Sequence, residues 1–141
     1  MHTFKENYLV HFGNITEAIG GETSDTITTL RFPSMENYDS IVFIGIASEV
    51  ASDAVITLTA YEATATAGTG STSISGATDT FTSTNTTDTD VLIVEVKASQ
   101  LTAGYQYVGA KLVSNNASGT EEGALIAIQC RARYGQATLV E

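Results

Sequence analysis

The chain has 141 residues, of which 43% are hydrophobic and 16% are charged. This length suits one domain, which buries roughly 68–70% of the surface that its unfolded chain exposes and therefore needs no disulfide or metal to fold. The net charge of −10, from 6 basic and 16 acidic residues, disfavours binding to nucleic acid and to anionic membranes, because negatively charged surfaces repel each other.

Alternation of apolar and polar residues, which is typical of β-strands, is the dominant pattern along the chain. The strands that it predicts lie at 8–12, 26–32, 55–62, 91–97, 105–113 and 126–133. Residues 41–47 are apolar without alternation. We therefore expect them to form a central strand that is covered on both faces.

Residues 64–90 have low complexity and are dominated by Thr, Ser, Ala, Gly and Asp. One interpretation is a flexible linker. The favoured one is a long hairpin with a polar tip, in which weaker strands at 71–75 and 80–84 are anchored by Ile74 and Phe81, because β-branched Thr favours extended chain.

Eight or nine short strands, separated by Gly- and Asn-rich turns, predict an all-β fold. A jelly-roll-like β-sandwich is the preferred architecture, and a small barrel is the alternative. Residues 1–141 are expected to form one such domain, with residues 1–12 as either an N-terminal arm or the first strand. The N-terminus lacks the pattern of a secretion signal, so we expect synthesis in a cytoplasm.

Few residues are candidates for catalysis or metal binding. His2 and His11 lack the partners that catalysis or zinc binding needs. Four carboxylates could gather around calcium, namely Glu62, Asp79, Asp88 and Asp90. They do not follow the spacing of a calcium-binding loop, so the favoured interpretation is that they lie in loops exposed to solvent. We therefore predict no catalytic residue, no metal site, no cofactor and no enzyme activity.

Cys130 is the single cysteine, so an internal disulfide is excluded. It alternates with the polar positions of the last strand, on the side of Ile126 and Ile128, and we expect a buried, inert thiol there. The pair Glu121-Glu122 before that strand is expected to be a solvated turn.

Two tyrosines and two arginines are the candidates for a contact surface. Tyr105 and Tyr107 are predicted to share one strand face, and Arg131 and Arg133 to share a face of the last strand. Tyr and Arg are enriched at protein interfaces. We predict that these four form the subunit interface of a homo-oligomer, with a trimer preferred; a sugar-stacking platform at the tyrosines and an internal salt bridge at the arginines are the alternatives.

Several stretches together resemble small phage head proteins, including capsid decoration (cement) proteins. They are DTITTL at 25–30, MENYDSIVFIG at 35–45, ISGAT at 74–78, YVGAKL at 107–112 and AIQCRAR at 127–133. The likeness runs from about Thr23 to Arg133. Gln106 and Gly109 depart from the pattern, since those places often hold arginines in the family, which weakens any transfer of charged contacts.

The resemblance implies a β-sandwich without enzyme activity that sits on the outside of the shell, with trimers at three-fold lattice positions. We therefore hypothesise a structural virion protein that binds the outer surface of the major capsid lattice and stabilises it. Its expected partners are the major capsid protein and further copies of itself, with no nucleic acid and no membrane. The alternative is a β-sandwich module of a tail or fibre that binds carbohydrate or a receptor.

Overall fold

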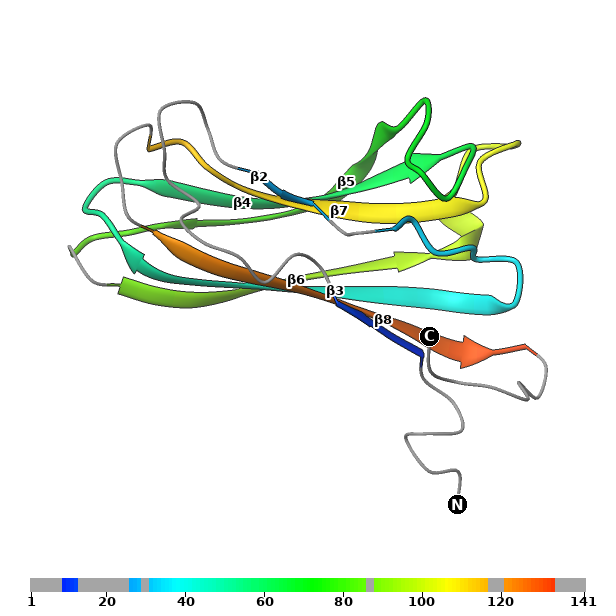
Figure 1. The fold of residues 1–141 in the computed structure, drawn as a ribbon, viewed down its shortest axis with the longest axis horizontal. Coiled ribbons are helices and arrows are strands. Elements are labelled where there is room, and N and C mark those ends of the chain that lie inside the picture. The colour runs from blue at the N-terminus through cyan, green and yellow to red at the C-terminus, as the bar shows by residue number, and fades with distance from the viewer. Residues whose placement is uncertain (1–8, 13–25, 29–30, 86–87, 117–120, 134–141) are drawn as a thin grey trace, which may run out of the picture.

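The computed structural model describes residues 9–12, 26–28, 31–85, 88–116 and 121–133 (Figure 1). The described chain is all-β apart from one turn of 3₁₀ helix, η1 (Ala98–Gln100). Its six long strands are β3 (Tyr38–Val50), β4 (Val55–Ala63), β5 (Thr72–Thr82), β6 (Asp88–Lys97), β7 (Tyr107–Ser114) and β8 (Glu122–Ala132). Two short strands, β1 (Leu9–Phe12) and β2 (Thr26–Thr28), pair with β8 and β7.

The strands form two antiparallel sheets that face each other (Figure 1). One sheet has the order β1-β8-β3-β6 and the other has the order β2-β7-β4-β5. Consecutive strands lie in opposite sheets except β4 and β5, which form a hairpin. Because most connections cross from one sheet to the other, the two sheets cannot separate as independent units.

The predicted number of strands is only partly met, because three long strands carry each sheet and the other two strands have 4 and 3 residues. The predicted hairpin with strands at 71–75 and 80–84 is also wrong, because the single strand β5 runs without a turn through most of both segments. A β-bulge explains the error. The pairing of β4 with β5 shifts register beyond Thr59, and Gly76 in β5 has a φ of 75° there.

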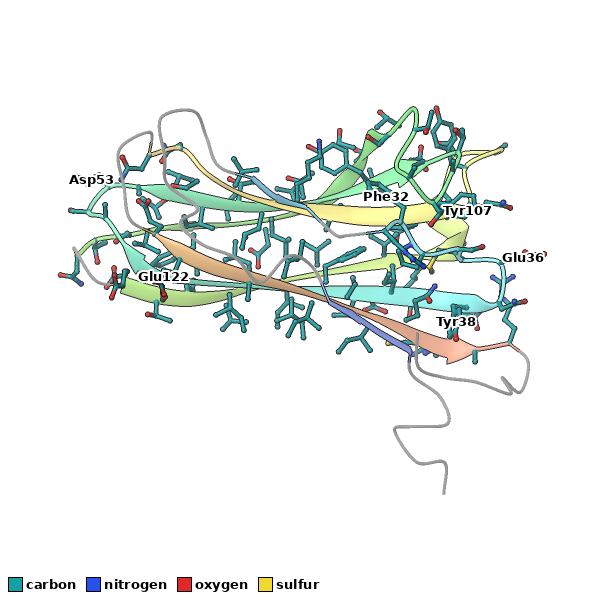
Figure 2. The ribbon with its side chains drawn as sticks, viewed as in Figure 1. Phe32, Glu36, Tyr38, Asp53, Tyr107 and Glu122 are labelled. Atoms are coloured by element: carbon teal, nitrogen blue, oxygen red, sulfur yellow. The ribbon has the colours of Figure 1, made fainter. Side chains whose placement is uncertain are left out.

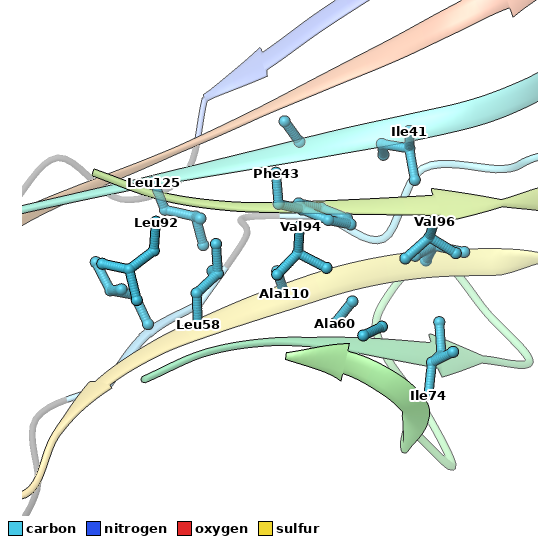
Figure 3. Packing of buried hydrophobic residues seen from close by; sticks show 14 of the residues in the cluster. Ile41, Phe43, Leu58, Ala60, Ile74, Leu92, Val94, Val96, Ala110 and Leu125 are labelled. Carbon is cyan, nitrogen blue, oxygen red and sulfur yellow. The ribbon is translucent and has the colours of Figure 1, made fainter. Parts of the chain in front are cut away.

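Apolar side chains from both sheets fill the space between them (Figure 3). Phe43 and Ile41 of β3 and Leu58 of β4 are fully buried there. Ile74 and Phe81, the predicted anchors of the low-complexity segment, both join this core, Ile74 as a buried residue and Phe81 from its edge. Burial of each large apolar side chain contributes roughly 1.5–3 kcal/mol, so this core is a main source of the stability of the sandwich.

β3 lies between β8 and β6, so 41–47 is part of a central strand as predicted. The expectation of cover on both faces is wrong. Ile41 and Phe43 are completely buried between the sheets, whereas Ile44 and Ile46 on the other face are half-buried. The physical reason is that a two-layer sandwich covers only one face of each sheet.

The face of β8 that meets the core is the opposite of the one expected from the sequence, where Cys130 was expected to be buried on the side of Ile126 and Ile128. Leu125, Ala127 and Gln129 are buried between the sheets, while Ile126 and Ile128 lie on the outer face and are half-buried. Strand alternation shows which residues share a face but does not show which face meets the core.

Residues 1–12 were expected to be either an arm or a first strand. Leu9–Phe12 pairs with β8 as β1, and residues 1–8 lie outside the described residues. Within the described ranges, no helix has the length and apolar character needed to cross a membrane.

Candidate functional site

The segment before β3 joins the two sheets at one end of the sandwich. Ser34 forms a bridge with Tyr107 at the start of β7, and its carbonyl accepts a 2.7 Å hydrogen bond from Gln129 Nε2 of β8. The N–H of Met35 also donates to the carbonyl of Gln106 at 2.8 Å. The start of β7 and the end of β8 therefore meet, although they are far apart in sequence. We call this the Ser34 end.

The two predicted tyrosines both belong to the Ser34 end (Figure 2 labels Tyr107). Their predicted arrangement on one strand is wrong, because β7 begins at Tyr107 and the N–H of Tyr105 instead donates to the carbonyl of Thr102 in a turn. Both side chains are half-buried. Each therefore leaves part of a large amphipathic ring available for contact.

The arginines lie at the same end but do not share a regular strand face. Arg131 has a φ of 57°, which breaks the alternation, and β8 ends one residue later. Arg133 Nε lies 2.7 Å from Asp39 Oδ1, and these side chains are 44% and 54% exposed. Such an exposed ion pair contributes little stability, because water screens it. Arg131 is also exposed. Their predicted role in a subunit interface stays a prediction.

The carboxylates considered for calcium hold backbone in place. Asp88 Oδ2 accepts hydrogen bonds from the N–H groups of Thr84 at 2.9 Å and Asn85 at 3.1 Å. These bonds, with that from the Asn85 amide, lower the pKa of Asp88, because they stabilise its charged form. No group of three or more metal-ligating side chains occurs among the residues that the structure describes.

Asp79 connects the edges of the two sheets. Its Oδ1 accepts from the N–H of Thr80, and its Oδ2 accepts at 2.9 Å from the N–H of Ile93 in β6. Since β6 is an edge strand of its sheet, this bond occupies a backbone donor that a strand from another molecule could otherwise use.

Two acidic residues expected in solvent are buried. Glu121, predicted to lie in a solvated turn, is completely buried, and its Oε1 accepts a 2.7 Å hydrogen bond from Asn116 Nδ2. Glu62, grouped above with the loop carboxylates, is 4% exposed. It belongs to the inward-facing residues of β4, because the period-2 alternation of that strand continues through it.

Glu62 is one of the residues that line a hollow between β4, β5 and the segment after β6. The volume of the hollow is about 520 Å³. Glu62 Oε2 accepts a 2.8 Å hydrogen bond from the N–H of Thr102. The rest of the lining is mainly hydroxyl and amide groups, from Thr72, Ser73, Ser75 and Gln100, with Ile74 as the apolar element. The lining therefore combines polar groups with an apolar wall at Ile74.

Cys130 is half-buried on the outer face of its sheet rather than fully buried as expected. Desolvation and the nearby Glu95 carboxylate raise the pKa of its thiol, while Arg131 acts in the opposite direction. A raised pKa reduces the thiolate fraction at neutral pH, which agrees with an unreactive thiol.

No family model matches this sequence. No curated protein matches it either. Among solved structures, the chain is similar to one from the infectious bursal disease virus Gt strain, with 13% identity, a TM-score of 0.47, and 94% of this chain and 34% of that chain covered. The comparison with dimeric latent PorU from Porphyromonas gingivalis gives 10% identity and a TM-score of 0.49, and it covers 90% of this chain and 13% of that chain.

Eiger TNF from S. frugiperda gives 12% identity, a TM-score of 0.45 and coverage of 94% of this chain and 98% of that chain. The chain spans about a third or less of the length of the first structures that it matches. Likeness at these identities and TM-scores is confined to general shape, and no function follows from it.

The site residues therefore fall into two groups. At the Ser34 end, four large side chains are partly or fully exposed, namely Tyr105, Tyr107, Arg131 and Arg133. The hollow at Glu62 is lined by hydroxyl groups and a buried carboxylate. Sequence patterns indicated the first group but missed the second, because its residues come from β4, β5 and the segment after β6, which only the fold brings together.

Proposed function

We propose that the protein is a structural component of a phage head, a decoration protein that binds the outer surface of the assembled major capsid lattice. The observation that carries this proposal is that the start of β7, with Tyr107, and the end of β8, with Arg131, meet through Ser34 at one end of a β-sandwich. The resemblance of several sequence stretches to small phage head proteins supports the same role.

The chemistry of the Ser34 end suits a protein partner. Tyr and Arg contribute large contact areas and directional hydrogen bonds, and they dominate the energetics of many interfaces. In a chain with a net charge of −10, Arg131 and Arg133 also offer attachment points for acidic groups of a neighbouring subunit. We assign this end to contacts between the protein and adjoining subunits of the shell.

The finer architecture is part of the proposal. We infer that the sandwich is a jelly roll, because β1-β8-β3-β6 faces β2-β7-β4-β5 and because two four-stranded sheets with crossing connections define that fold. The inference depends on β1 and β2, which extend each three-stranded frame by one short strand.

A decoration protein acts through the assembled state. Ligands that bind only one state stabilise it by mass action, and weak contacts repeated over a lattice add through multivalency. The acidic balance favours a place outside the shell rather than against packaged DNA. The proposal therefore includes no enzyme activity, no cofactor, no nucleic-acid partner and no membrane partner.

The test is to add the purified chain back to heads that lack it. We expect saturable uptake by assembled shells, no uptake by free capsid subunits, and DNA retention at a higher temperature. Tyr107→Ala combined with Arg131→Ala should reduce uptake at least tenfold. Ser52→Ala combined with Thr82→Ala is the control, because both exposed residues lie at the end of the sandwich opposite Tyr107, next to Asp53 (Figure 2). Absence of uptake, or attachment to the tail alone, contradicts the proposal.

The hollow at Glu62 favours a second candidate, a tail or fibre module that binds carbohydrate. Its hydroxyl-rich lining and buried carboxylate match the hydrogen-bonding needs of a sugar. Screening the purified chain against a glycan array separates the two functions. Binding that Glu62→Gln abolishes would favour the module, whereas an array without signal would leave the decoration protein as the better account.

A further inference from the structure

The outer face of the sheet formed by β8, β3 and β6 is apolar at its centre. The pairing registers arrange its outward residues in three rows across the strands. The rows are Ala124–Ile46–Val91, Ile126–Ile44–Ile93 and Ile128–Val42–Glu95. We call these nine residues the outer apolar face. Eight of the nine are apolar, and Glu95 is the exception.

This face is open along β6, where Val91 is 49% exposed and Ile93 is 57% exposed. Single exposed apolar residues are ordinary on protein surfaces, but a contiguous apolar area across three strands is a mark of interaction sites. The opposite sheet differs. At the corresponding central positions its outer face carries Thr57, Thr59 and Thr80. The apolar outer face is therefore a property of one sheet and not of the whole surface.

The charges at the two ends of the outer apolar face have opposite sign. Beyond the row of Glu95, Lys97 of β6 is exposed and pairs with Ser40 of β3. Arg131 of β8 is also exposed at this end. At the other end, Glu122 of β8 is exposed beside Ser48. Figure 2 shows that Glu122 and the Tyr38 region, where β8 ends, lie at opposite ends of the sheet. Lys97 and Arg131 supply the positive charge of this end, because Arg133 is already paired with Asp39.

We propose that the outer apolar face binds a second copy of the same chain, face to face, about a two-fold axis that runs across the strands. Such an axis reverses the strand direction of the second copy. The basic end of each copy then meets the acidic end of the other, and β8 lies over β8, with Arg131 near Glu122 of the partner subunit. An axis along the strands would instead place like charges together.

Charge complementarity is the reason for choosing a second copy as the occupant. Two chains of charge −10 repel each other in general. Within the outer apolar face only Glu95 is charged. The basic residues at one end of the face are complementary in charge to the acidic residue at its other end. It therefore satisfies the requirement of an isologous interface, in which one patch must be complementary to itself.

The size of the face indicates a weak, reversible contact. Three strands spaced about 4.8 Å apart and five residues of about 3.3 Å each give a flat footprint of roughly 250 Å² for the apolar rows. A standard stable interface buries about 800 Å² on each partner. We therefore expect dimers at high chain concentration. This two-fold contact is separate from the trimer predicted from sequence, and it does not depend on the proposed capsid function.

Sedimentation of the purified full-length chain, from about 10 μM to about 1 mM, tests the proposal. We expect a reversible monomer–dimer equilibrium. Ile93→Asp should weaken dimerisation at least tenfold, because it places a carboxylate in the middle row. Thr82→Asp is the matched control, since it adds the same charge at an exposed position of β5 in the other sheet. Circular dichroism establishes that both variants stay folded.

A charge exchange tests the orientation. Arg131→Glu and Glu122→Arg should each weaken the dimer several-fold at low salt, because each places like charges at both ends of the contact. The double variant should restore dimerisation, since opposite charges then meet again. High salt should reduce all three effects.

Each other outcome overturns the proposal. A chain that remains monomeric at 1 mM shows that the face is not self-complementary or is covered by other parts of the chain. A dimer that Ile93→Asp leaves intact uses another surface. A double variant that is as weak as the single ones excludes the two-fold arrangement across the strands.

Discussion

Gly45 of β3 faces buried side chains of the opposite sheet, and its replacement by alanine is expected to destabilise the sandwich. A Cβ atom at Gly45 would lie 2.9 Å from Leu112 Cδ1 and 3.5 Å from Leu58 Cδ2. The first distance is shorter than carbon atoms tolerate. Leu112 belongs to β7 of the opposite sheet and is completely buried, so it has little room to move.

Two effects of opposite sign determine the magnitude. Replacing glycine with alanine within a strand gains about 0.5–1 kcal/mol, because the unfolded chain loses conformational freedom. Adding a methyl group to a packed core costs about 1–3 kcal/mol. We therefore expect Gly45→Ala to lower the free energy of unfolding by about 0.5–2 kcal/mol, which is close to a 2–6 °C decrease in Tm for a domain of this size.

The decisive assay is a double-mutant cycle by urea unfolding. Leu112→Ala alone should cost about 2–5 kcal/mol through its cavity. With both changes, the methyl group added at position 45 would enter the space that Leu112 leaves. The cost of the double variant should therefore fall short of the sum of the two single costs by more than about 0.5 kcal/mol. Additive costs, or a Gly45→Ala variant more stable than the wild type, would refute the packing of β3 against β7.

Three further predictions concern the hairpin tip, an acidic loop and a sheet edge. Gly68→Ala should cost more stability in thermal unfolding than Gly76→Ala, because both have φ of +75° but only at Gly68 would the Cβ meet Phe32, at 2.8 Å; equal costs would contradict this. The pKa of Asp88 is lower in the folded protein than its ordinary value of 3.8. The ionised carboxylate therefore stabilises the fold fully above pH 3.8, and this contribution is lost as the pH falls through the pKa of the folded state. Asp88→Asn should therefore flatten the acid-unfolding curve below pH 3.8, and an unchanged curve would count against its hydrogen bonds. Asp79→Ala should lower the free energy of unfolding by about 1–2 kcal/mol, because the N–H of Ile93 loses its acceptor. It should also hasten aggregation, measured by light scattering, because the edge of β6 becomes free to pair. Asp79→Asn keeps an acceptor and should therefore lower the free energy of unfolding less.

The fold class could be predicted from the sequence because alternation is a local property. Residues such as Leu92, Val94 and Val96 alternate with exposed positions, and the structure buries all three. The boundaries were harder to predict. Gly76 allows a bulge within β5, and no periodic pattern distinguishes such a bulge from a break between two strands.

Which face of a strand meets the core could not be predicted for β3 and β8. Both strands have apolar residues on both faces, so hydrophobicity alone does not select between Ile41 and Ile44 or between Leu125 and Ile126. The excess of apolar residues was nevertheless a usable signal. In a two-layer fold, an apolar second face has no covering layer, which points to an exposed contact surface.

The candidate site could be predicted only where it depends on residue type. Tyr107 and Arg131 were selected because Tyr and Arg favour interfaces, and the structure places them at the same end. Their local arrangement followed from features without a sequence signature, above all the φ of 57° at Arg131. Glu62 looked like a loop carboxylate because the hollow around it forms only after β4 and β5 pair.

The most direct test of the proposed function is a cryo-electron microscopy reconstruction of heads after the purified chain has been added. The account predicts density for the β-sandwich at regular positions on the outer surface of the shell, with the Ser34 end facing capsid subunits. Density confined to the tail or its fibres, or shells that remain bare at saturating protein, would contradict it.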